Sequence, residues 1–482
     1  MYLATLVFLL ALACLTSFGA AYYLFTTRFD STLPNADALP ANVSQALEAD
    51  NYDYDLCPPV NPNDKYLAYL PHSGFHNQRI ALENALTLSR LLNRTLIVLP
   101  ARLGRKALRY ADYDSLKSYV SLSGKEGLKH CSRIPSHVTI PPECSDYWEY
   151  TLLSWEWLVD LRDIKSQQPI IFRWNLSDAW IDDCLGVSRS DTFTLKDSSR
   201  YHYRFLDTVT DASPDSHKFQ EDIYLPTLVD IPQRLLQMGT LFGSSRLRLL
   251  NDGNLALRRK VRTSMTIVNP VLLHVSDLVH DKLGGYYLGA HIRLGDGQFS
   301  VHGNENVREI WWRLVHETLG FSIEDTLSLE SSFAATEVSP SPPFHSIQRP
   351  IQSQVVSPSM ISPNIRCRAI LHSLPHLTKL NVPLYISTDV KDPLQDPTLA
   401  LFLRTFPCSF FFTDFAQEAT ILDQLVNNYD GLPLKPFTVP FVDAIIIGKA
   451  SHVVGTPGST FSRFVEDHLW PKYHGLPIKE RG

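Results

Sequence analysis

Runs of apolar residues alternate with amphipathic stretches along the chain from residue 66 onward. Residues 66–70 (YLAYL) and 95–99 (TLIVL) are apolar or aromatic, and the second run is rich in β-branched side chains and ends at Pro100. Between them, apolar side chains recur at helical spacing, at Ala81, Ala85, Leu88 and Leu92. Continuous apolar strands joined by a helix are typical of a parallel sheet with both faces covered. Residues 66–100 therefore predict a βαβ unit and an α/β fold.

A second series of such runs begins near residue 285. The pattern predicts strands over 286–292, ending at 385–387, over 408–412 and over 452–455, with a helix over 439–450. Residues 331–363 interrupt this series with Ser- and Pro-rich sequence. Such a composition cannot bury a core, so it predicts a disordered insertion in a surface loop. We therefore expect two α/β lobes facing a cleft, over 63–275 and 276–482.

The first 27 residues carry no charged side chain, and the apolar run over 3–25 is long enough to cross the ~30 Å hydrocarbon core of a bilayer. We therefore expect an uncleaved transmembrane anchor over 1–27. A Pro-, Asn- and Asp-containing stem over 28–62 follows it. Two alternatives stay open. The small residues near 17–21 also fit a cleaved signal peptide, and the run also fits a buried core helix.

The sequence beyond the anchor suggests a lumenal body. It contains three N-x-S/T sequons, at Asn42, Asn93 and Asn175, and six cysteines, at positions 57, 131, 144, 184, 367 and 408. Six cysteines allow 15 pairings, which sequence alone does not resolve. Cys131 and Cys144 enclose a short loop and are the best local pair, while six free buried thiols remain the alternative. We expect a single-pass type II membrane protein of the Golgi or endoplasmic reticulum.

Composition narrows the classes of function. Of 482 residues, 44% are hydrophobic and 20% charged, which excludes a wholly disordered chain. The formal charge is −6 and no long basic run occurs, so a dedicated nucleic-acid binder is not expected. Five tryptophans occur between residues 148 and 180, at positions 148, 155, 157, 174 and 180. They fit either a packed core or platforms for stacking sugars, and their spacing does not separate the two.

Four sequence segments follow predicted strands, and open α/β sheets bind ligands beyond the carboxyl ends of their strands. Two of these segments could bind an anion. In residues 71–79 (PHSGFHNQR), Gly74 allows close approach of the backbone to a ligand, and Asn77 opens the following helix. An ordinary glycine turn with an asparagine N-cap is the alternative. In residues 291–296 (HIRLGD), His291 and Arg293 share one face, and the arginine can fork onto a phosphate. A pair between Arg293 and Asp296 that holds the turn is the alternative.

The other two segments suit a nucleotide. After the strand ending at 387, Asp389 can accept hydrogen bonds from a base or ribose, or can cap a helix. In residues 455–464 (GTPGSTFSRF), the amides and hydroxyls near Ser459 and Thr460 can cradle a phosphate. No lysine follows, which excludes a P-loop ATPase, and the segment is not G-x-S-x-G. The acidic pairs Asp182–Asp183 and Asp389–Asp392 are interpreted as solvated or capping side chains, so no metal site is expected.

The order of these motifs resembles the GDP-fucose protein O-fucosyltransferase family over about residues 66–470. The resemblance implies a GT-B fold of two Rossmann-like lobes and inverting, metal-independent transfer of fucose from GDP-fucose to a protein Ser/Thr hydroxyl or a glycan. By this resemblance, Arg293 contacts the β-phosphate, and His291 and Asn77 line the same cleft. Asp389 holds the nucleoside. Three residues of the last motif, Ser459, Thr460 and Phe461, cradle the diphosphate and nucleotide.

The chain also departs from the family pattern. Some relatives carry an acidic base in the first glycine loop, where this chain has His72 and Ser73. The general base is therefore either His72 or His76, or the leaving diphosphate accepts the proton. Two alternatives for the whole protein are a transferase of the same fold that uses another nucleotide sugar and a non-catalytic relative that binds sugar nucleotides or glycans.

The topology gives the first testable prediction. If residues 1–27 anchor a lumenal body, intact vesicles should protect that body from added protease, and detergent should remove the protection. Immunoblotting of the body after digestion measures this. Complete digestion without detergent would contradict the predicted orientation.

Overall fold

The computed structural model of the chain describes residues 40–47, 54, 56–135, 137–209, 218–295, 297–334, 343 and 365–480. The expected anchor over 1–27 lies outside these residues, as does most of the stem and of the Ser/Pro-rich insertion. Within the described ranges, no helix has both the length and the apolar character needed to cross a bilayer. The described part of the expected stem includes a short helix, α2 (Ala41–Leu47), which the sequence pattern did not predict. The insertion begins later than expected, because α13 (Ile323–Phe333) continues through residue 333.

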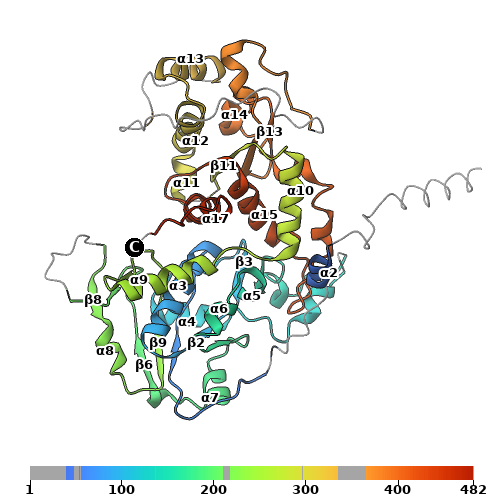
Figure 1. Ribbon diagram of the computed structural model, residues 1–482. Helices are drawn as coiled ribbons and strands as arrows, with labels where there is room; N and C mark the ends of the chain where they lie inside the picture. The colour runs from blue at the N-terminus through green and yellow to red at the C-terminus, as the bar shows by residue number, and fades with distance from the viewer. Residues whose placement is uncertain are drawn as a thin grey trace, which may run out of the picture. The chain divides into compact units, whose positions relative to one another are not determined.

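A parallel five-stranded sheet organises the first half of the unit Asp50–Gly482 (Figure 1). Its strand order is β5-β2-β1-β9-β6. The strands are β1 (Tyr66–Ala68), β2 (Thr95–Val98), β5 (Ile170–Phe172), β6 (Thr192–Leu195) and β9 (Leu235–Met238). Helix α3 (Phe75–Leu91) connects β1 to β2 and buries most of one face. The predicted βαβ unit over 66–100 is therefore confirmed, with both strands and the helix in the expected places.

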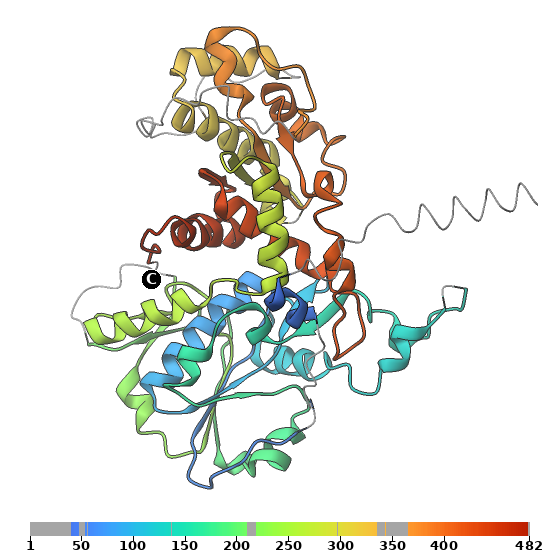
Figure 2. The ribbon, with the colours of Figure 1, turned by 45° about the vertical axis from the view of Figure 1, so that its right-hand side comes forward.

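A parallel four-stranded sheet organises the second half, with the order β13-β12-β11-β14. Its strands are β11 (Leu288–Ile292), β12 (Leu384–Thr388), β13 (Ser409–Phe410) and β14 (His452–Gly455). Helix α10 (Pro270–Lys282) leads from the first half into this sheet and packs against α15 (Lys435–Lys449), as Figure 2 shows. All predicted strands of this series are present. Two sheets with only parallel pairs confirm the α/β class, while the exact domain boundary near residue 275 stays a prediction.

Smaller elements fill the spaces around the two sheets. Strands β3 (Ala101–Gly104) and β4 (Tyr150–Leu153) pair antiparallel, and β7 (Tyr203–Leu206) lies between β8 (Glu221–Tyr224) and β10 (Leu247–Arg248). The remaining α-helices are α4 (Tyr113–Ser121), α5 (Trp155–Leu158), α6 (Arg162–Lys165), α7 (Ala179–Leu185), α8 (Leu225–Val229), α9 (Asp252–Ser264), α11 (Gly297–Val301), α12 (Gly303–Trp312), α14 (Ala400–Thr405), α16 (Thr460–Phe464) and α17 (Trp470–Tyr473). Trp155, Trp174 and Trp180 are buried, which supports core packing for these three.

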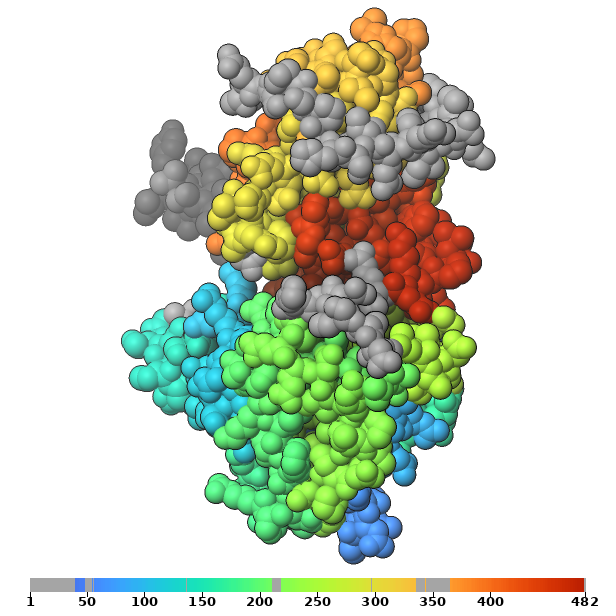
Figure 3. All heavy atoms as spheres, turned by 90° about the vertical axis from the view of Figure 1, so that its left-hand side faces the viewer, coloured from blue at the N-terminus to red at the C-terminus, as the bar shows by residue number. Residues whose placement is uncertain are grey.

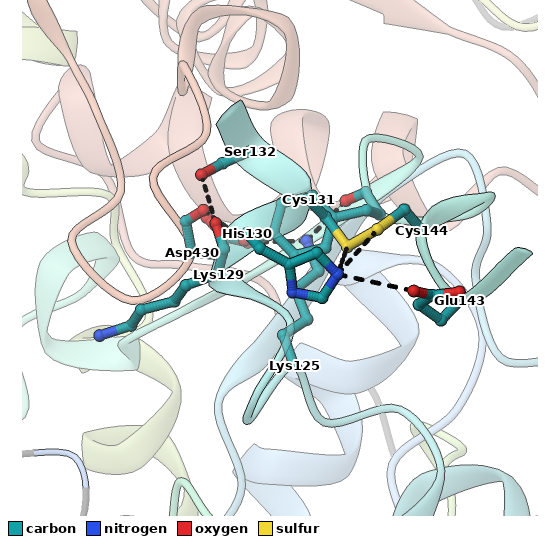
Figure 4. The surroundings of a disulfide bond; sticks show 9 residues. Lys125, Lys129, His130, Cys131, Ser132, Glu143, Cys144 and Asp430 are labelled. Carbon is teal, nitrogen blue, oxygen red and sulfur yellow. Dashed lines mark hydrogen bonds and ion pairs between the residues drawn. A yellow bond between two sulfur atoms is a disulfide. The ribbon is translucent and has the colours of Figure 1, made fainter. Parts of the chain in front are cut away.

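Three disulfides link the six cysteines that the described residues contain. They are Cys57–Cys184, Cys131–Cys144 and Cys367–Cys408. The local pair expected from sequence, Cys131–Cys144, is confirmed, and the alternative of six free thiols is wrong. Figure 4 shows this bond beside His130, whose Nε2 lies 3.6 Å from both sulfur atoms.

A buried ion pair joins the two halves close to this disulfide. The Lys125 ammonium donates to Asp430 Oδ2 at 2.8 Å, and the two side chains are only 1% and 0% exposed. Lys125 also donates to the carbonyls of Tyr147 and Tyr150, at 2.7 and 2.5 Å. Asp430 Oδ2 accepts a second bond from Thr151 Oγ1 at 2.8 Å. Burial lowers the pKa of Lys125, and the Asp430 carboxylate offsets part of that shift.

The buried pair gives a stability prediction. Asp430→Asn leaves the Lys125 charge buried without its counterion, which costs about 3–5 kcal/mol when one partner of a buried pair is removed. Denaturant unfolding should show this loss. Asp423→Asn is the control, because Asp423 forms a more exposed pair with Lys435, and such pairs contribute about 0–1 kcal/mol. An Asp430→Asn protein as stable as Asp423→Asn would contradict the structural role of the pair.

Candidate functional site

The strand order of the second sheet places one crevice between β11 and β14. The chain leaves β11 toward β12 on one side, whereas β14 lies on the other side, so the loops after β11 and β14 diverge. Ligands of open α/β sheets bind at such a topological switch point, beyond the carboxyl ends of the strands. Arg293 follows β11 and Thr456 follows β14. Two of the segments predicted from sequence therefore flank a single crevice.

Thr456 holds the two strand ends together. Its hydroxyl donates to the His291 carbonyl at 3.0 Å and accepts from the Arg293 amide at 2.9 Å. On β14, Gly455 packs directly against the start of α16. A Cβ there would lie 2.4 Å from Ser462 Cβ, so a larger residue would push the helix away. The geometry of this crevice therefore depends on a hydroxyl and a glycine.

His291 is built into the wall of the crevice. Its Nδ1 hydrogen-bonds with Ser462 Oγ at 2.6 Å, and its ring stacks on Phe461 with centroids 4.1 Å apart. The ring is 6% exposed. Burial is the main reason that the pKa of His291 falls to about 3, and the nearby Arg293 charge lowers it further. The imidazole is thus neutral at physiological pH.

Arg293 is half-exposed at the mouth of the same crevice. Its guanidinium carbon lies 4.6 Å from the centre of the Phe299 ring. Guanidinium groups stack on aromatic faces, and their planar fork of donors matches the geometry of a phosphate. Asp296, proposed from sequence as an alternative partner, lies outside the described residues.

The first sheet has its own switch point, between β1 and β9. His72 lies in the loop after β1 and spans this crevice, because its Nε2 hydrogen-bonds with Thr240 Oγ1 at 2.8 Å. Its Nδ1 hydrogen-bonds with Ser73 Oγ at 2.7 Å. Burial, with Arg200 and Arg246 nearby, lowers the pKa of His72 to about 3. Both ring nitrogens are therefore engaged within the protein.

Helix α3 brings the two crevices together. His76, in its first turn, lies 4.9 Å from Phe461 and 5.0 Å from Phe464, measured between ring centroids. Burial lowers the pKa of His76 well below 6.5, and Arg79, His291 and Arg293 contribute in the same direction. The structure thus brings His76 into the same electrostatic environment as the loop after β11. Its buried Nδ1 has no hydrogen-bond partner among the described residues.

Gly74 and Asn77 occupy the first turn of α3 differently than the sequence suggested. The helix begins at Phe75, and Gly74 is its N-cap. The alternative that Asn77 caps the helix is therefore wrong, because its amide already donates to the Gly74 carbonyl at 3.0 Å. Gly74 is exposed, and no atom lies within 4 Å of where its Cβ would be. This leaves room for a ligand beside the loop.

Asp389 lies at the end of β12 and supports the loop after β11. Its Oδ1 accepts from the Leu294 amide at 2.8 Å and its Oδ2 from the Gly295 amide at 3.0 Å. The alternative that Asp389 caps a following helix is wrong, because the carboxylate caps the neighbouring loop instead. A contact with a nucleoside stays a prediction, and such a ligand would share oxygens that already hold the Arg293 loop.

The last motif starts a helix, as expected. Ser459 is the N-cap of α16, is fully buried, and its hydroxyl accepts from the Ser462 amide at 3.3 Å. Thr460 and Phe461 are partly exposed beside it. Ser459 therefore stabilises the start of the helix. Of the predicted cradle, Thr460, Phe461 and the backbone amides remain the groups that a ligand can reach.

The described residues contain one group of side chains with metal-like spacing, at His130, Cys131 and Cys144. The two cysteines form a disulfide, so their sulfur atoms are not thiolates and do not offer the ligands that zinc prefers. Asp182 and Asp183 are exposed on α7, as the interpretation of solvated acids requires. Metal independence stays a prediction.

Sequence reasoning missed three residues that position the site. They are Thr456 and Ser462, which contact Arg293 and His291 across 163 and 171 positions of the chain, and Phe299, which follows Arg293 closely in α11. Thr456 had a detectable signal, because it is a hydroxyl residue directly after a predicted strand. Ser462 lies within the segment 455–464 that the sequence singled out, but its contact with His291 on another element was not predictable from the pattern, and nothing in the sequence marked Phe299.

Comparisons with known proteins give remote similarity alone. No family model matches the sequence, and no curated protein matches it. Among solved structures, the chain is similar to POFUT1 in complex with GDP, with a TM-score of 0.38, 11% identity, and coverage of 87% of this chain and 98% of that one. It is similar to NodZ alpha-1,6-fucosyltransferase soaked with GDP-fucose, with a TM-score of 0.34, 10% identity, and coverage of 84% and 94%. At these values the similarity does not assign an activity.

The buried histidines predict a pH dependence of stability. In the unfolded chain a histidine protonates near pH 6.5, whereas His72 and His291 protonate only near pH 3 when folded. Between these values the unfolded state binds more protons, so the unfolding free energy should fall as pH falls. The expected slope is about 1.4 kcal/mol per pH unit for each such histidine.

His72→Gln should flatten this dependence by about one proton's contribution. Thermal unfolding across this pH range measures the slope. His376→Gln, at an exposed position, is the control and should leave the slope unchanged. Equal slopes in the wild type and His72→Gln would show that His72 is not held neutral in the fold.

Proposed function

We propose that this chain is a GT-B glycosyltransferase of the secretory pathway that transfers fucose from GDP-fucose to a protein Ser/Thr hydroxyl or a glycan, with inversion and without a metal ion. The order of the motifs supports the donor and the reaction, because it resembles the GDP-fucose protein O-fucosyltransferase family. Three disulfides support an oxidising compartment such as the lumen.

The observation that carries the proposal is the convergence of two switch points. The β1 loop continues into α3, whose His76 lies against Phe461 of α16, and α16 packs against His291 beside Arg293. A transferase that uses a nucleotide sugar needs one sheet that binds the nucleotide and an opposing surface that binds the acceptor. The loops after β1, β11 and β14 provide both at one place.

The negative charge that develops on the departing GDP explains why we assign hydrogen-bond donors to the site. The acceptor oxygen attacks the anomeric carbon, the bond from that carbon to the β-phosphate oxygen breaks, and its electron pair leaves with GDP. Negative charge therefore grows on the diphosphate in the transition state. Arg293 and the amides at the start of α16 are donors that are already in position to stabilise this charge.

The proton of the acceptor hydroxyl goes to the departing diphosphate in this proposal. A terminal phosphate has a second pKa of about 6, whereas burial holds the pKa of His72 at about 3 and that of His76 well below 6.5. The phosphate is thus the stronger base of the groups present. His76 and His291 then serve as neutral walls that exclude water beside the reacting atoms.

A donor assay tests the proposal directly. The purified lumenal body is incubated with GDP-fucose, with other GDP-sugars and with UDP-sugars in the presence of EDTA, and sugar release is followed. We expect turnover of GDP-fucose and of none of the other nucleotide sugars. Preference for another donor would replace the proposal by a different nucleotide sugar, and nucleotide binding without turnover would indicate a non-catalytic relative. Activity restored only by Mn²⁺ or Mg²⁺ would refute metal independence.

Arg293 provides the sharpest prediction. If its guanidinium forks onto the β-phosphate, the contact strengthens as GDP departs and acts mainly on the transition state. Arg293→Ala should lower GDP-fucose turnover by about 10²–10³, as for loss of one preorganised donor. Arg293→Lys should not recover full activity, because an ammonium lacks the planar fork.

A purely structural role for Arg293 predicts a different outcome. If Arg293 only held its turn through Asp296, Asp296→Asn would lower turnover as much as Arg293→Ala does, and both changes would lower the melting temperature. Turnover and thermal unfolding of the three variants separate the roles. Near-normal turnover in Arg293→Ala would remove the main catalytic assignment.

A further inference from the structure

Besides the loops after β11 and β14, which we call the donor loops and which contain Arg293, the protein has a second basic region. It lies about one turn along α3 from His76. Three helices, α3, α9 and α16, line a cavity of about 200 Å³. Five cationic side chains reach it, from Arg79, Lys218, Arg258, Arg262 and Arg463, against two carboxylates, from Glu83 and Asp467. Burial holds the pKa of His468, which also lines the cavity, well below 6.5. The lining therefore carries a net charge of about plus three at neutral pH.

The helices direct a continuous face toward this cavity. On α3, Arg79, Glu83 and Asn84 follow His76 at helical spacing, and on α16 Thr460, Arg463 and Phe464 share one face. In Figure 3 the red C-terminal segment borders the yellow-green segment that contains α9. The cavity thus lies between parts of both halves, about one turn, or ~5 Å, along α3 from His76.

Two of the arginines lack carboxylate partners. The Arg262 side chain forms no hydrogen bond or ion pair with any described residue, and its Nε is buried. Arg463 is exposed, and its side chain likewise has no such partner within the described ranges. Arg258 is anchored differently, since it donates to the Ser244 and Leu247 carbonyls at 2.6 and 3.0 Å.

Arg79 adds a buried donor to the same cavity. Its side chain is 4% exposed and pairs with Glu83, and its guanidinium carbon lies 4.3 Å from the centre of the Phe464 ring. Its Nε is buried without a hydrogen-bond partner among the described residues. A buried N–H without a partner costs free energy, and a bound oxyanion would recover it.

The cavity shares Thr460, at the start of α16, with the proposed donor cradle, but neither Arg293 nor His291 lines it. His76 lies near both basic regions, because the charges of Arg79 and Arg293 both lower its pKa. An acceptor bound next to the donor sugar would extend past His76 toward the cavity.

We propose that this cavity is an anion-binding subsite that receives a carboxylate, sulfate or phosphate group carried by the acceptor. The assignment to the acceptor rests on the proposed function, whereas binding of an oxyanion rests on the cavity alone. Arg262 and Arg463 supply the unpaired charge, and Arg79 Nε supplies a buried donor. An acceptor with an acidic group near its reacting hydroxyl is therefore the preferred class of substrate.

Inorganic sulfate probes the subsite on the full chain. The donor site is first saturated with GDP, and the melting temperature is followed against sulfate, with chloride holding the ionic strength constant. A saturable rise is expected in the wild type. Because loss of one hydrogen bond to a charged group weakens binding by about tenfold or more, half-saturation should need at least about tenfold more sulfate in Arg262→Gln.

Arg463→Gln is a second variant, because it is exposed and should fold normally, and it should weaken sulfate binding as well. Arg259→Gln is the matched control. Arg259 neighbours Arg258 on α9 but pairs with Glu480 and does not line the cavity, so its variant should titrate like the wild type. Absence of a saturable rise in the wild type, or equal titrations in all variants, would overturn the subsite.

Calorimetric titration with GDP separates the acceptor from the nucleotide as the source of the anion. GDP affinity should be unchanged in Arg262→Gln and weakened in Arg293→Ala. An equal loss in both would assign the cavity to the nucleotide phosphates and overturn the acceptor subsite. If GDP does not bind the wild type at all, the proposed function fails, while sulfate titration of Arg293→Ala still decides whether the cavity binds an oxyanion.

Discussion

The buried ion pair between Lys125 and Asp430 fixes how the two halves of Asp50–Gly482 meet. Removing two charges from water is costly, and the cost is recovered only where every remaining donor and acceptor finds a partner. Here the Lys125 ammonium has three oxygen partners, and the Asp430 carboxylate binds Thr151 Oγ1 and the Leu432 amide as well. Few other arrangements of the halves would satisfy all these groups, so the pair selects one relative placement.

Helix α15 connects the relative placement of the two halves to the geometry of the site. The helix begins at Lys435, five residues after Asp430, and packs on β11 and β12. The strand β11 carries Arg293 at its end, and α16 presses Phe461 against His76 from the first half. A shift at Asp430 would therefore move the donor loops relative to α3. The site is assembled from both halves, and its geometry depends on an interaction that contacts no substrate.

Sequence patterns predicted the strands and helices that depend on neighbouring residues in the chain. The strand over 452–455 matches β14, and the βαβ unit over 66–100 is present, because apolar continuity reports burial on both faces of a parallel strand. The start of α3 was missed by two residues, since Gly74 caps it through an extended backbone without a side-chain bond. The pairing of Lys125 with Asp430 spans 305 positions, and periodicity carries no information on such contacts. The same holds for the bond between His291 and Ser462.

The buried histidines of the site keep the same charge over the pH range in which an exposed histidine titrates. An exposed histidine changes charge between pH 5 and 8, but burial holds His72 and His291 neutral down to a pKa of about 3. An imidazolium beside Arg293 would repel it and compete for the same anion. Arginine guanidinium groups stay protonated throughout this range. Among His72, His76, His291 and Arg293, positive charge at physiological pH therefore resides on Arg293, and it does not depend on the protonation of these three histidines.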